Sequence, residues 1–406
     1  MQWFVFVVSG SLSFIIVAAS LLDLQGAARA RFMTSVLIVL AVTTLVQAAV
    51  GHRLPLFEGP STPYVAMLVV LVQGAPVTPA LRAQLAGALV LAGLVVGAVG
   101  WFAGRALVRL LSPYVVGSFL FLLGLTLLLR LAPQALGHTA TRLVEPAAGF
   151  ALLAVLASSL LVYRAGPPLL RALIFLSGYL AGLTAYLLAG GPLDATAASS
   201  AIFVVPRLGP LAVPAPTLLI VVVLTMLIPM INVYASIEAV AAAMPVRERV
   251  DLRGATALYG AAQVLAGLVG SVGTVPRSES SGLVAASGAV SRQPLVIAAL
   301  ALVGVALLGP AVAVLASFPV AVAIDVLMVA AAFVALIARR LYARVRWSRP
   351  RAAATLAALA LCLALTVVST GWGAVSVFLS NPILPGTLLA IAIDQAGRAG
   401  PSRQPA

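Results

Sequence analysis

Apolar stretches of helical length recur along the whole chain, separated by short links that carry arginine, proline or glycine. A helix needs about 20 apolar residues to cross about 30 Å of hydrocarbon. A membrane β-barrel would instead alternate apolar and polar residues along each strand. The pattern therefore predicts an all-α integral membrane protein. The stretches near full length are residues 2–22, 33–50, 81–102, 106–130, 147–163, 170–190, 215–243, 254–270, 293–309, 312–337, 352–370 and 374–394.

Two further apolar segments, residues 54–74 and 272–292, are interrupted rather than continuous. Each begins extended, contains a proline, passes a serine and then becomes helical. If the fourteen segments are divided into two sets of seven, these two take the third position of each set. Interrupted helices at corresponding positions are typical of inverted-repeat transporters, which bind substrate at the breaks. The sequence therefore predicts 14 transmembrane segments in two inverted seven-segment repeats, with broken half-helices at segments 3 and 10.

The composition agrees with a membrane location, because 63% of the residues are hydrophobic and only 8% are charged. All 24 basic residues are arginines, and the net charge is +14. With a cytoplasmic N-terminus, 17 arginines fall on the inner side and six on the outer side, and Arg277 lies within the membrane. The positive-inside rule therefore predicts a multi-pass protein of a bacterial-type cytoplasmic (inner) membrane with both termini cytoplasmic. The basic loops suit an anionic lipid bilayer and do not indicate nucleic-acid binding.

Residues 2–22 are expected to be a membrane helix rather than a signal peptide, because no basic segment precedes them and the apolar stretch is too long.

Several sequence features argue against enzymatic, metal or cofactor chemistry. Cys362 is the single cysteine, so no intramolecular disulfide is expected. His52 is expected in an inner-face loop and His138 in an outer loop, neither with other metal ligands nearby. No phosphate-binding loop or nucleophile motif occurs.

Three acidic residues stand inside apolar segments, where a carboxylate is costly unless it faces a cavity or a partner. Glu238 lies in INVYASIEAVAAAM, Glu279 in GTVPRSESSGLVAASG and Asp325 in PVAVAIDVLMV. Glu279 follows the break in the tenth segment and begins a new helix, which points to a substrate site. Burial favours the protonated carboxyl group, so Glu238 and Glu279 are also the candidate proton-coupling residues. For Asp325, a relay or domain-contact role and a hydrogen-bonded structural role both stay open.

Two polar residues flank the break of the third segment. Glu58 is expected near the cytoplasmic mouth with Arg53 as its partner, and a proton relay is the alternative. Gln47 is expected to connect the second segment to the broken third segment.

Four stretches resemble the nucleobase–cation symporter-2 family, which comprises the xanthine/uracil permeases and the nucleobase–ascorbate transporters. TTLVQAAVGHRLPLFEGPSTPYV (43–65) resembles the junction of that family's second and third segments. PRSESSGLVAASGAVSRQP (276–294) resembles its tenth segment. SIEAVAAA (236–243) is similar to its eighth segment and SPYVVGSFLFLLGLTL (112–127) to its fifth. The resemblance covers most of the chain in order and spacing.

The resemblance implies two domains that hold the substrate between them and alternate its access to the two sides of the membrane. The core domain would comprise residues 1–104 (segments 1–4) and 210–310 (segments 8–11). The gate domain would comprise residues 105–192 (segments 5–7) and 311–396 (segments 12–14). Family members often form homodimers through the gate domain, so a homodimer is expected.

The implied function is proton-coupled symport of a purine or pyrimidine nucleobase of the uracil, xanthine or urate class, with sodium as the alternative coupling ion. Glu238 and Glu279 match the family's base-binding carboxylates, and Ser278 matches a residue whose backbone faces the ligand. Ionised carboxylates only accept hydrogen bonds, so they suit the N–H groups of a base. Amide groups at the half-helix starts near Ser61 and Ser278 suit its carbonyl groups.

The sequence departs from the family pattern at several site positions. Thr62 stands where the family usually has phenylalanine, with Tyr64 two residues on as a substitute for stacking. Ser280 replaces an asparagine and Arg277 replaces a tyrosine. Arg277 either pairs with one of the two glutamates or meets an anionic substrate.

The second of these roles for Arg277 supports an alternative function. An anion transporter or exchanger of the same inverted-repeat fold, like the sulfate and bicarbonate carriers, would use Arg277 and the half-helix amides. Such a transporter should not need two carboxylates that only accept hydrogen bonds. A channel or a non-transporting membrane protein is the third class that stays open. The charge of the substrate discriminates between the first two classes.

Overall fold

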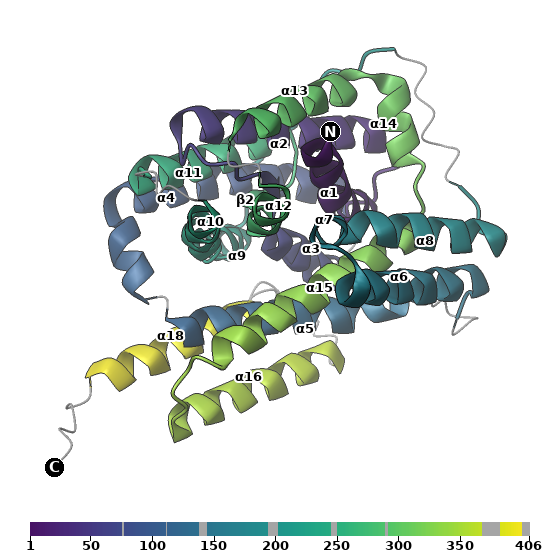
Figure 1. Cartoon of the computed structure of the whole chain (residues 1–406). Helices are drawn as coiled ribbons and strands as arrows, with labels where there is room; N and C mark the ends of the chain where they lie inside the picture. The colour runs from purple at the N-terminus through teal and green to yellow at the C-terminus, as the bar shows by residue number, and fades with distance from the viewer. Residues whose placement is uncertain are drawn as a thin grey trace.

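The structure is a computed structural model, and it describes residues 1–74, 77–110, 112–137, 144–193, 202–244, 250–288, 291–367 and 382–399. The described chain is mostly helical, which confirms the predicted all-α class (Figure 1). The helices up to the middle of the chain are α1 (Gln2–Leu21), α2 (Gly26–Val50), α3 (Thr62–Gly74), α4 (Pro79–Leu110), α5 (Pro113–Ala135), α6 (Pro146–Ala165), α7 (Pro168–Ala172) and α8 (Ile174–Leu188).

The remaining helices follow after residue 201 and are generally shorter. They are α9 (Pro216–Leu227), α10 (Met230–Ala243), α11 (Leu252–Leu268), α12 (Ser280–Ser287), α13 (Gln293–Leu307), α14 (Gly309–Ala316), α15 (Val320–Tyr342), α16 (Arg349–Val367) and α18 (Ile383–Ala399). Among the described residues, seven helical spans are long and apolar enough to cross a membrane. This confirms a multi-pass membrane protein.

One predicted boundary in the first half is wrong. The segment expected at residues 106–130 begins only at Pro113, because α4 continues to Leu110. Ser112 caps α5, since its hydroxyl accepts a hydrogen bond from the Val115 amide at 3.3 Å. A serine cap followed by proline in the first turn is a strong helix start.

A boundary in the second half also differs from the prediction. The segment expected at residues 312–337 is divided, because α14 ends at Ala316 and α15 begins at Val320. Pro319 stands between them in an extended conformation, with ψ 133°. Proline favours a helix start but removes the amide that a continuous helix would need. Of the segment expected at residues 374–394, only the part from residue 382 lies within the described chain.

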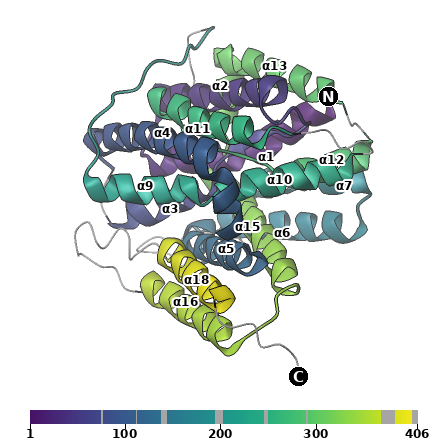
Figure 2. The same ribbon diagram turned by 90° about the vertical axis from the view of Figure 1, so that its left-hand side faces the viewer.

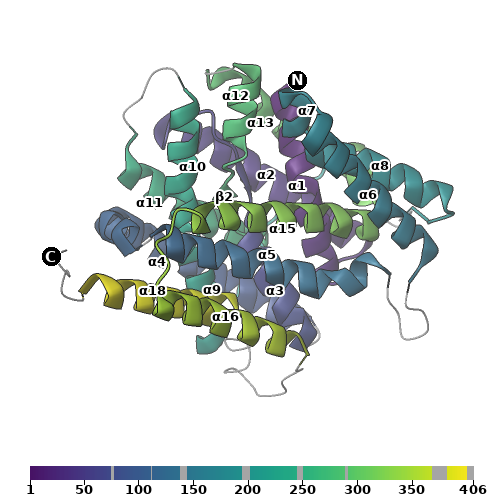
Figure 3. The same cartoon turned by 60° about the horizontal axis from the view of Figure 1, so that its bottom comes forward.

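The helices form two groups that pack against each other. In the first group α4 packs along α11 and α2 along α13, together with α1, α3, α9, α10 and α12. In the second group α5 packs along α15, with α6, α8, α16 and α18 around this pair. Figure 2 shows α5, α16 and α18 below α2, α4 and α11. Figure 3 shows α5 between α15 on one side and the α16–α18 pair on the other.

The two interrupted segments cross inside the first group. Strand β1 (Glu58–Pro60) pairs antiparallel with strand β2 (Thr274–Pro276), and both strands are buried. Chain segment 54–74 therefore enters as a strand and continues as α3, and segment 272–292 continues as α12. This order of strand and helix confirms the predicted interruptions. The crossing brings the starts of the two half-helices close together.

A polar side chain of α11 holds this crossing. Gln263 of α11 forms a two-way contact with Thr274, because its Nε2 donates to the Thr274 carbonyl and its Oε1 accepts from the Thr274 amide, both at 3.0 Å. Gln47 was expected to contact the broken third segment, but its side chain forms its hydrogen bond elsewhere in the described chain. Its Nε2 donates to the Ala255 carbonyl at 2.9 Å and so ties α2 to α11.

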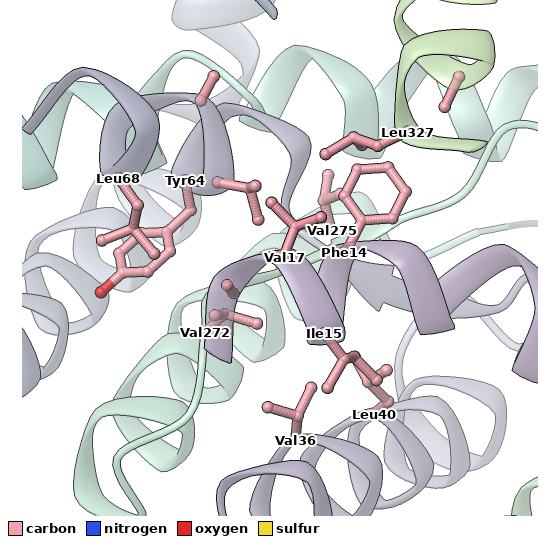
Figure 4. Packing of buried hydrophobic residues seen from close by; sticks show 14 of the residues in the cluster. Phe14, Ile15, Val17, Val36, Leu40, Tyr64, Leu68, Val272, Val275 and Leu327 are labelled. Carbon is pink, nitrogen blue, oxygen red and sulfur yellow. The ribbon is translucent and has the colours of Figure 1, made fainter. Parts of the chain in front are cut away.

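The hydrophobic core is continuous between the two groups of helices. Phe14 and Val17 of α1 lie in the same hydrophobic cluster as Val275 of β2 and Leu327 of α15 (Figure 4). Cys362 is buried, with its sulfur 3.7 Å from the hydroxyl of Thr126. Apolar contact therefore extends across the boundary between the two groups.

Candidate substrate cavity

A cavity of about 870 Å³ lies between the two groups of helices. Ligand sites of proteins are usually about 300–1,000 Å³. Side chains of α5 and α15, such as Leu120 and Val334, provide an apolar wall. The opposite wall is polar and comes from α3, α10 and the break between β2 and α12. Its polar members are Thr62, Asn232, Tyr234, Glu238, Arg277, Ser278, Glu279 and Ser281.

Most of the site residues predicted from the sequence lie on this polar wall. Glu238 is exposed on α10, and the side chain of Glu279 is 39% exposed at the start of α12. Thr62 begins α3 and Ser278 precedes α12, so both half-helix starts reach the cavity. The fold thus brings together two carboxylates that lie 41 positions apart in the sequence.

Three other predicted site residues lie behind the wall. The Ser280 hydroxyl accepts from the Phe57 amide at 3.2 Å, and the Ser61 amide donates to the Gly273 carbonyl at 2.7 Å. Tyr64 is buried and points into the hydrophobic core, so it is no substitute for the missing aromatic (Figure 4). Ser61 and Ser280 hold the crossing rather than line the cavity.

Asp325 also lies away from the cavity wall. It is completely buried in α15, and neither carboxylate oxygen has a hydrogen-bond partner among the described residues. The hydrogen-bonded structural role is therefore not what the structure shows. A relay or domain-contact role for Asp325 stays a prediction.

The guanidinium group of Arg277 interacts with neighbouring groups of the protein. Its Nη2 donates to the Pro60 carbonyl at 3.2 Å, and its Cζ lies 4.3 Å from the centre of the Phe14 ring. Its Nη1 is 3.8 Å from Oε1 of Glu279. The stem rests on Gly59, where an added Cβ would lie 2.4 Å from Nε. These contacts favour the ion-pair interpretation of Arg277 over a free anion-binding group.

Backbone donors complete the polar wall at the start of α12. The Arg277 amide donates to the Phe57 carbonyl at 2.9 Å, and the Ser280 amide donates to the Arg277 carbonyl at 3.0 Å. Between them, the amides of Ser278 and Glu279 donate to no acceptor in the described chain. Unsatisfied amides at a helix start attract carbonyl oxygens and anions. The cavity therefore offers acceptors and donors side by side.

Sequence reasoning missed several lining residues. Tyr234 stands four positions before Glu238, which places both on one face of α10, so this spacing was a usable signal. Phe14 and Asn232 gave no such signal, because their position depends on how α1 and α10 pack. Phe14 and Tyr234 are the aromatic residues among the described lining residues, and the ring of Phe14 lies against Arg277.

Glu58 is not at the mouth of the cavity, so that expectation is wrong, whereas His52 lies in the bend after α2, as expected of a loop residue. Each is buried with at most 1% of its surface exposed, whereas Arg53 is exposed. His52 Nε2 lies 3.9 Å from Oε1 of Glu58. Pairing of β1 with β2 pulls this part of the chain into the first group of helices. His138 lies outside the described residues.

The cavity occupies one end of the molecule. On the apolar wall, its lining residues come from the first half of α5 and the second half of α15, which is the end predicted to be cytoplasmic. Towards the other end, the two groups are joined by polar contacts. Nη2 of Arg29 in α2 donates to the Phe318 carbonyl at 3.1 Å, and the Tyr179 hydroxyl of α8 donates to Oγ of Ser13 in α1 at 2.8 Å.

Replacing Tyr179 with phenylalanine is expected to make the cavity more accessible from the end at which these polar contacts join the two groups. The change removes a hydrogen bond worth about 1 kcal/mol, which corresponds to about a fivefold shift in population. Impermeant thiol labelling of Thr62→Cys, in a Cys362→Ala background, measures the change. Tyr163→Phe is the control, since Tyr163 is 40% exposed on α6. Equal labelling in both variants would contradict the closing role of Tyr179.

These features define the class of the protein: a membrane transporter with a polar cavity at two interrupted helices. The sequence profile of the xanthine/uracil permeases, described as the Permease family, matches residues 1–371. The chain therefore belongs to this family, as expected from its motifs. Among proteins with curated functions, no match to the chain was found.

Solved structures of anion transporters share the fold. The transmembrane domain of the cyanobacterial bicarbonate transporter BicA is 17% identical, with a TM-score of 0.64, 97% of this chain covered and 96% of that one. Murine Slc26a9, an anion transporter in the inward-facing state, is 15% identical, with a TM-score of 0.64 and coverage of 98% and 68%. A further SLC26A9 structure is 13% identical, with a TM-score of 0.59 and coverage of 98% and 65%. At these identities, the likeness concerns the fold alone.

Proposed function

We propose that the protein is a secondary active transporter that moves a nucleobase-like substrate together with a proton. The charge of the cavity wall carries this proposal. Among the described lining residues, the charged groups are Glu238, Glu279 and Arg277, so the net charge of the wall is −1 when both carboxylates are ionised. A wall of negative charge disfavours an anion and favours a neutral substrate rich in N–H groups.

The hydrogen-bonding groups of the wall match the edge of a nucleobase. A lactam edge places an N–H donor beside a carbonyl acceptor. Glu238 and Glu279 can accept from such donors, and the free amides of Ser278 and Glu279 can donate to such carbonyls. A site that hydrogen-bonds each polar edge rejects analogues that lack one of them. This complementarity supports the uracil, xanthine or urate class of substrate.

We also propose the 14-segment inverted repeat as the basis of alternating access. Segments one to seven would be α1, α2, β1–α3, α4, α5, α6 and α7–α8, and segments eight to fourteen would be α9–α10, α11, β2–α12, α13, α15, α16 and α18. If the two halves are exchanged by a twofold axis, the helix pair α4–α11 corresponds to the pair α13–α2. The helix pair α6–α8 corresponds in the same way to the pair α16–α18. All four pairs are in contact. The α5–α15 and β1–β2 pairs convert into themselves, which supports the repeat.

In this proposal the core domain (1–104 and 210–310) moves against the gate domain (105–192 and 311–396). The cavity lies where Glu238 and Glu279 of the core domain face the apolar wall of α5 and α15 in the gate domain. Sliding of one domain past the other would carry the substrate from one side of the membrane to the other. The protein would reside in a cytoplasmic membrane with both termini cytoplasmic.

Uptake into proteoliposomes tests the proposal. Radiolabelled uracil, xanthine, urate and adenine are offered with an inward proton gradient, with the gradient collapsed, and with a sodium gradient instead. We expect accumulation of one of these bases that requires the proton gradient. Accumulation of sulfate or bicarbonate, with none of any base, would contradict the proposal.

Anion transport is the second candidate, because solved anion transporters share the fold and Arg277 lies at the start of α12. Replacing Arg277 with glutamine discriminates the two. In a base transporter this variant is expected to weaken base binding moderately, by about tenfold, because Arg277 acts by holding Glu279 and Pro60. In an anion transporter it would abolish substrate binding. Equilibrium binding is measured beside the exposed control Arg340→Gln.

A further inference from the structure

A second pair of titratable side chains lies in the first group of helices, separate from the cavity. Glu58 is the first residue of β1, and His52 follows the end of α2. Neither residue lines the cavity. In a strand successive side chains point to opposite faces, and Gly59 faces Arg277. Glu58 therefore points away from Arg277 and the cavity wall.

The hydrogen bonds around His52 fix its neutral form. The Leu54 amide donates to Nδ1 of His52 at 3.1 Å, so Nδ1 carries no proton. The hydrogen of the neutral ring is then on Nε2, the nitrogen that lies 3.9 Å from Oε1 of Glu58. Neither Nε2 nor either oxygen of Glu58 has a hydrogen-bond partner among the described residues.

The surroundings of Glu58 disfavour its ionised form. A buried carboxylate without donors or a close cation is strongly destabilised. The elements in contact with β1 are α1, α2 and β2. Helix α1 has no ionisable side chain, Arg29 and Arg31 lie at the far end of α2, and Arg277 follows β2 on the opposite face. Tyr259 of α11 is buried, and its hydroxyl donates to the Met226 carbonyl at 3.0 Å.

We propose that Glu58, with His52, is a proton-binding site behind the cavity, distinct from Glu238 and Glu279. Binding adds a proton to one oxygen of the Glu58 carboxylate, forms its O–H bond and changes no other bond. In the present conformation Glu58 is the neutral acid and His52 is neutral. Release of the proton leaves a buried anion, so it requires that the crossing move and admit water.

The structure links this pair to the substrate wall through one residue. Phe57 directly precedes Glu58; its carbonyl accepts from the Arg277 amide, and its amide donates to the Ser280 hydroxyl. Movement at Glu58 therefore reaches the start of α12, where the free amides face the cavity. A role in coupled transport rests on the proposed function, whereas proton binding by Glu58 does not.

Infrared difference spectroscopy of the full chain in lipid nanodiscs tests proton binding without any substrate. We expect a carbonyl band of a protonated carboxylic acid at neutral pH that disappears in Glu58→Gln. The band should persist in Glu238→Gln, whose side chain is exposed. Asp325→Asn identifies any contribution of Asp325, which is also completely buried. If Glu58→Gln leaves the spectrum unchanged, the proposal is overturned.

His52 provides a second readout that stays available if Glu58→Gln does not fold. The chain has two histidines, so His138→Gln leaves His52 as the only one. Nitrogen NMR should then show the Nε2–H tautomer and a neutral ring at about pH 5, where a free histidine is protonated. A ring already charged at about pH 6 would overturn the proposal.

Transport measurements distinguish a failure of this proposal from a failure of the proposed function. If a base is carried, Glu58→Gln should exchange it across the membrane but no longer accumulate it against its gradient. If no base is carried, the infrared and NMR results still decide whether Glu58 binds a proton. Unimpaired proton-driven accumulation by Glu58→Gln would overturn the coupling role.

Discussion

Replacing Glu279 with glutamine is expected to lower affinity for the transported base by about 100-fold while the protein stays folded. Glu279 is the N-cap residue of α12, yet its side chain makes no capping hydrogen bond and faces the cavity. Glutamine keeps the shape but presents an N–H₂ group to the N–H of the base. Loss of a hydrogen bond to a charged group costs about 1.5–3 kcal/mol, and an opposed donor adds to that loss.

Equilibrium binding of the radiolabelled base to purified protein measures the effect of Glu279→Gln. Glu145→Gln is a matched control, because Glu145 is also a helix N-cap without a side-chain cap hydrogen bond. It begins α6, outside the cavity lining. Thermal unfolding of both variants should resemble that of the unmodified protein. Equal affinities in the two variants would show that Glu279 does not contact the substrate.

The position of Glu279 could be predicted because its sequence context is unusual in two ways. An acid within an apolar segment needs a cavity or a partner, and a Pro/Ser break before it indicates a half-helix start. The structure places Glu279 and Glu238 on one wall as expected. The same reasoning could not place Tyr64, since the face that α3 turns towards the cavity depends on its packing against α1 and α5.

The wrong prediction for the position of Glu58 has a different physical cause. Strands β1 and β2 are each three residues long, too short for an alternating pattern to be recognised in the sequence. Their pairing joins segments more than 200 positions apart and decides which face each side chain takes. Without that pairing, Glu58 beside Arg53 suggests an exposed ion pair. With it, Glu58 is buried beside His52.

The predictions of helix boundaries were wrong where hydropathy is uniform along the chain and only the capping residues mark the helix ends. The apolar pattern runs through residues 81–130 with few interruptions, so hydropathy alone does not locate the turn between α4 and α5. Ser112 and Pro113 mark it by local chemistry. Capping signals are thus more informative than hydropathy inside a membrane protein whose links are short.

Replacing Gly260 with leucine is expected to cause the largest loss of stability of any single change considered. Gly260 of α11 meets α4 so closely that an added Cβ would lie 2.3 Å from the Cα of Gly97 and 2.6 Å from the carbonyl oxygen of Gly93. Both obstacles are backbone atoms and cannot rotate away. Close contact through small residues is what holds membrane helices together.

The expected size of the effect follows from the need to separate α4 from α11. Overpacking usually costs about 1–3 kcal/mol, and more where the backbone itself must move. We therefore expect Gly260→Leu to lower the free energy of unfolding by more than about 3 kcal/mol and to lose its monodisperse peak in gel filtration. Gly304→Leu is the control, since no atom lies within 4 Å of an added Cβ there. Equal stability of the two variants would contradict the packing role of Gly260.

The same substitution should also affect transport in any protein that still folds. Gln263, one turn after Gly260, holds Thr274 of β2 through two hydrogen bonds of 3.0 Å. Displacement of α11 would therefore move β2 and, with it, the amides of Ser278 and Glu279. The milder Gly260→Ala variant should retain the fold and lose substrate affinity. Unchanged affinity in Gly260→Ala would mean that α11 does not position the start of α12.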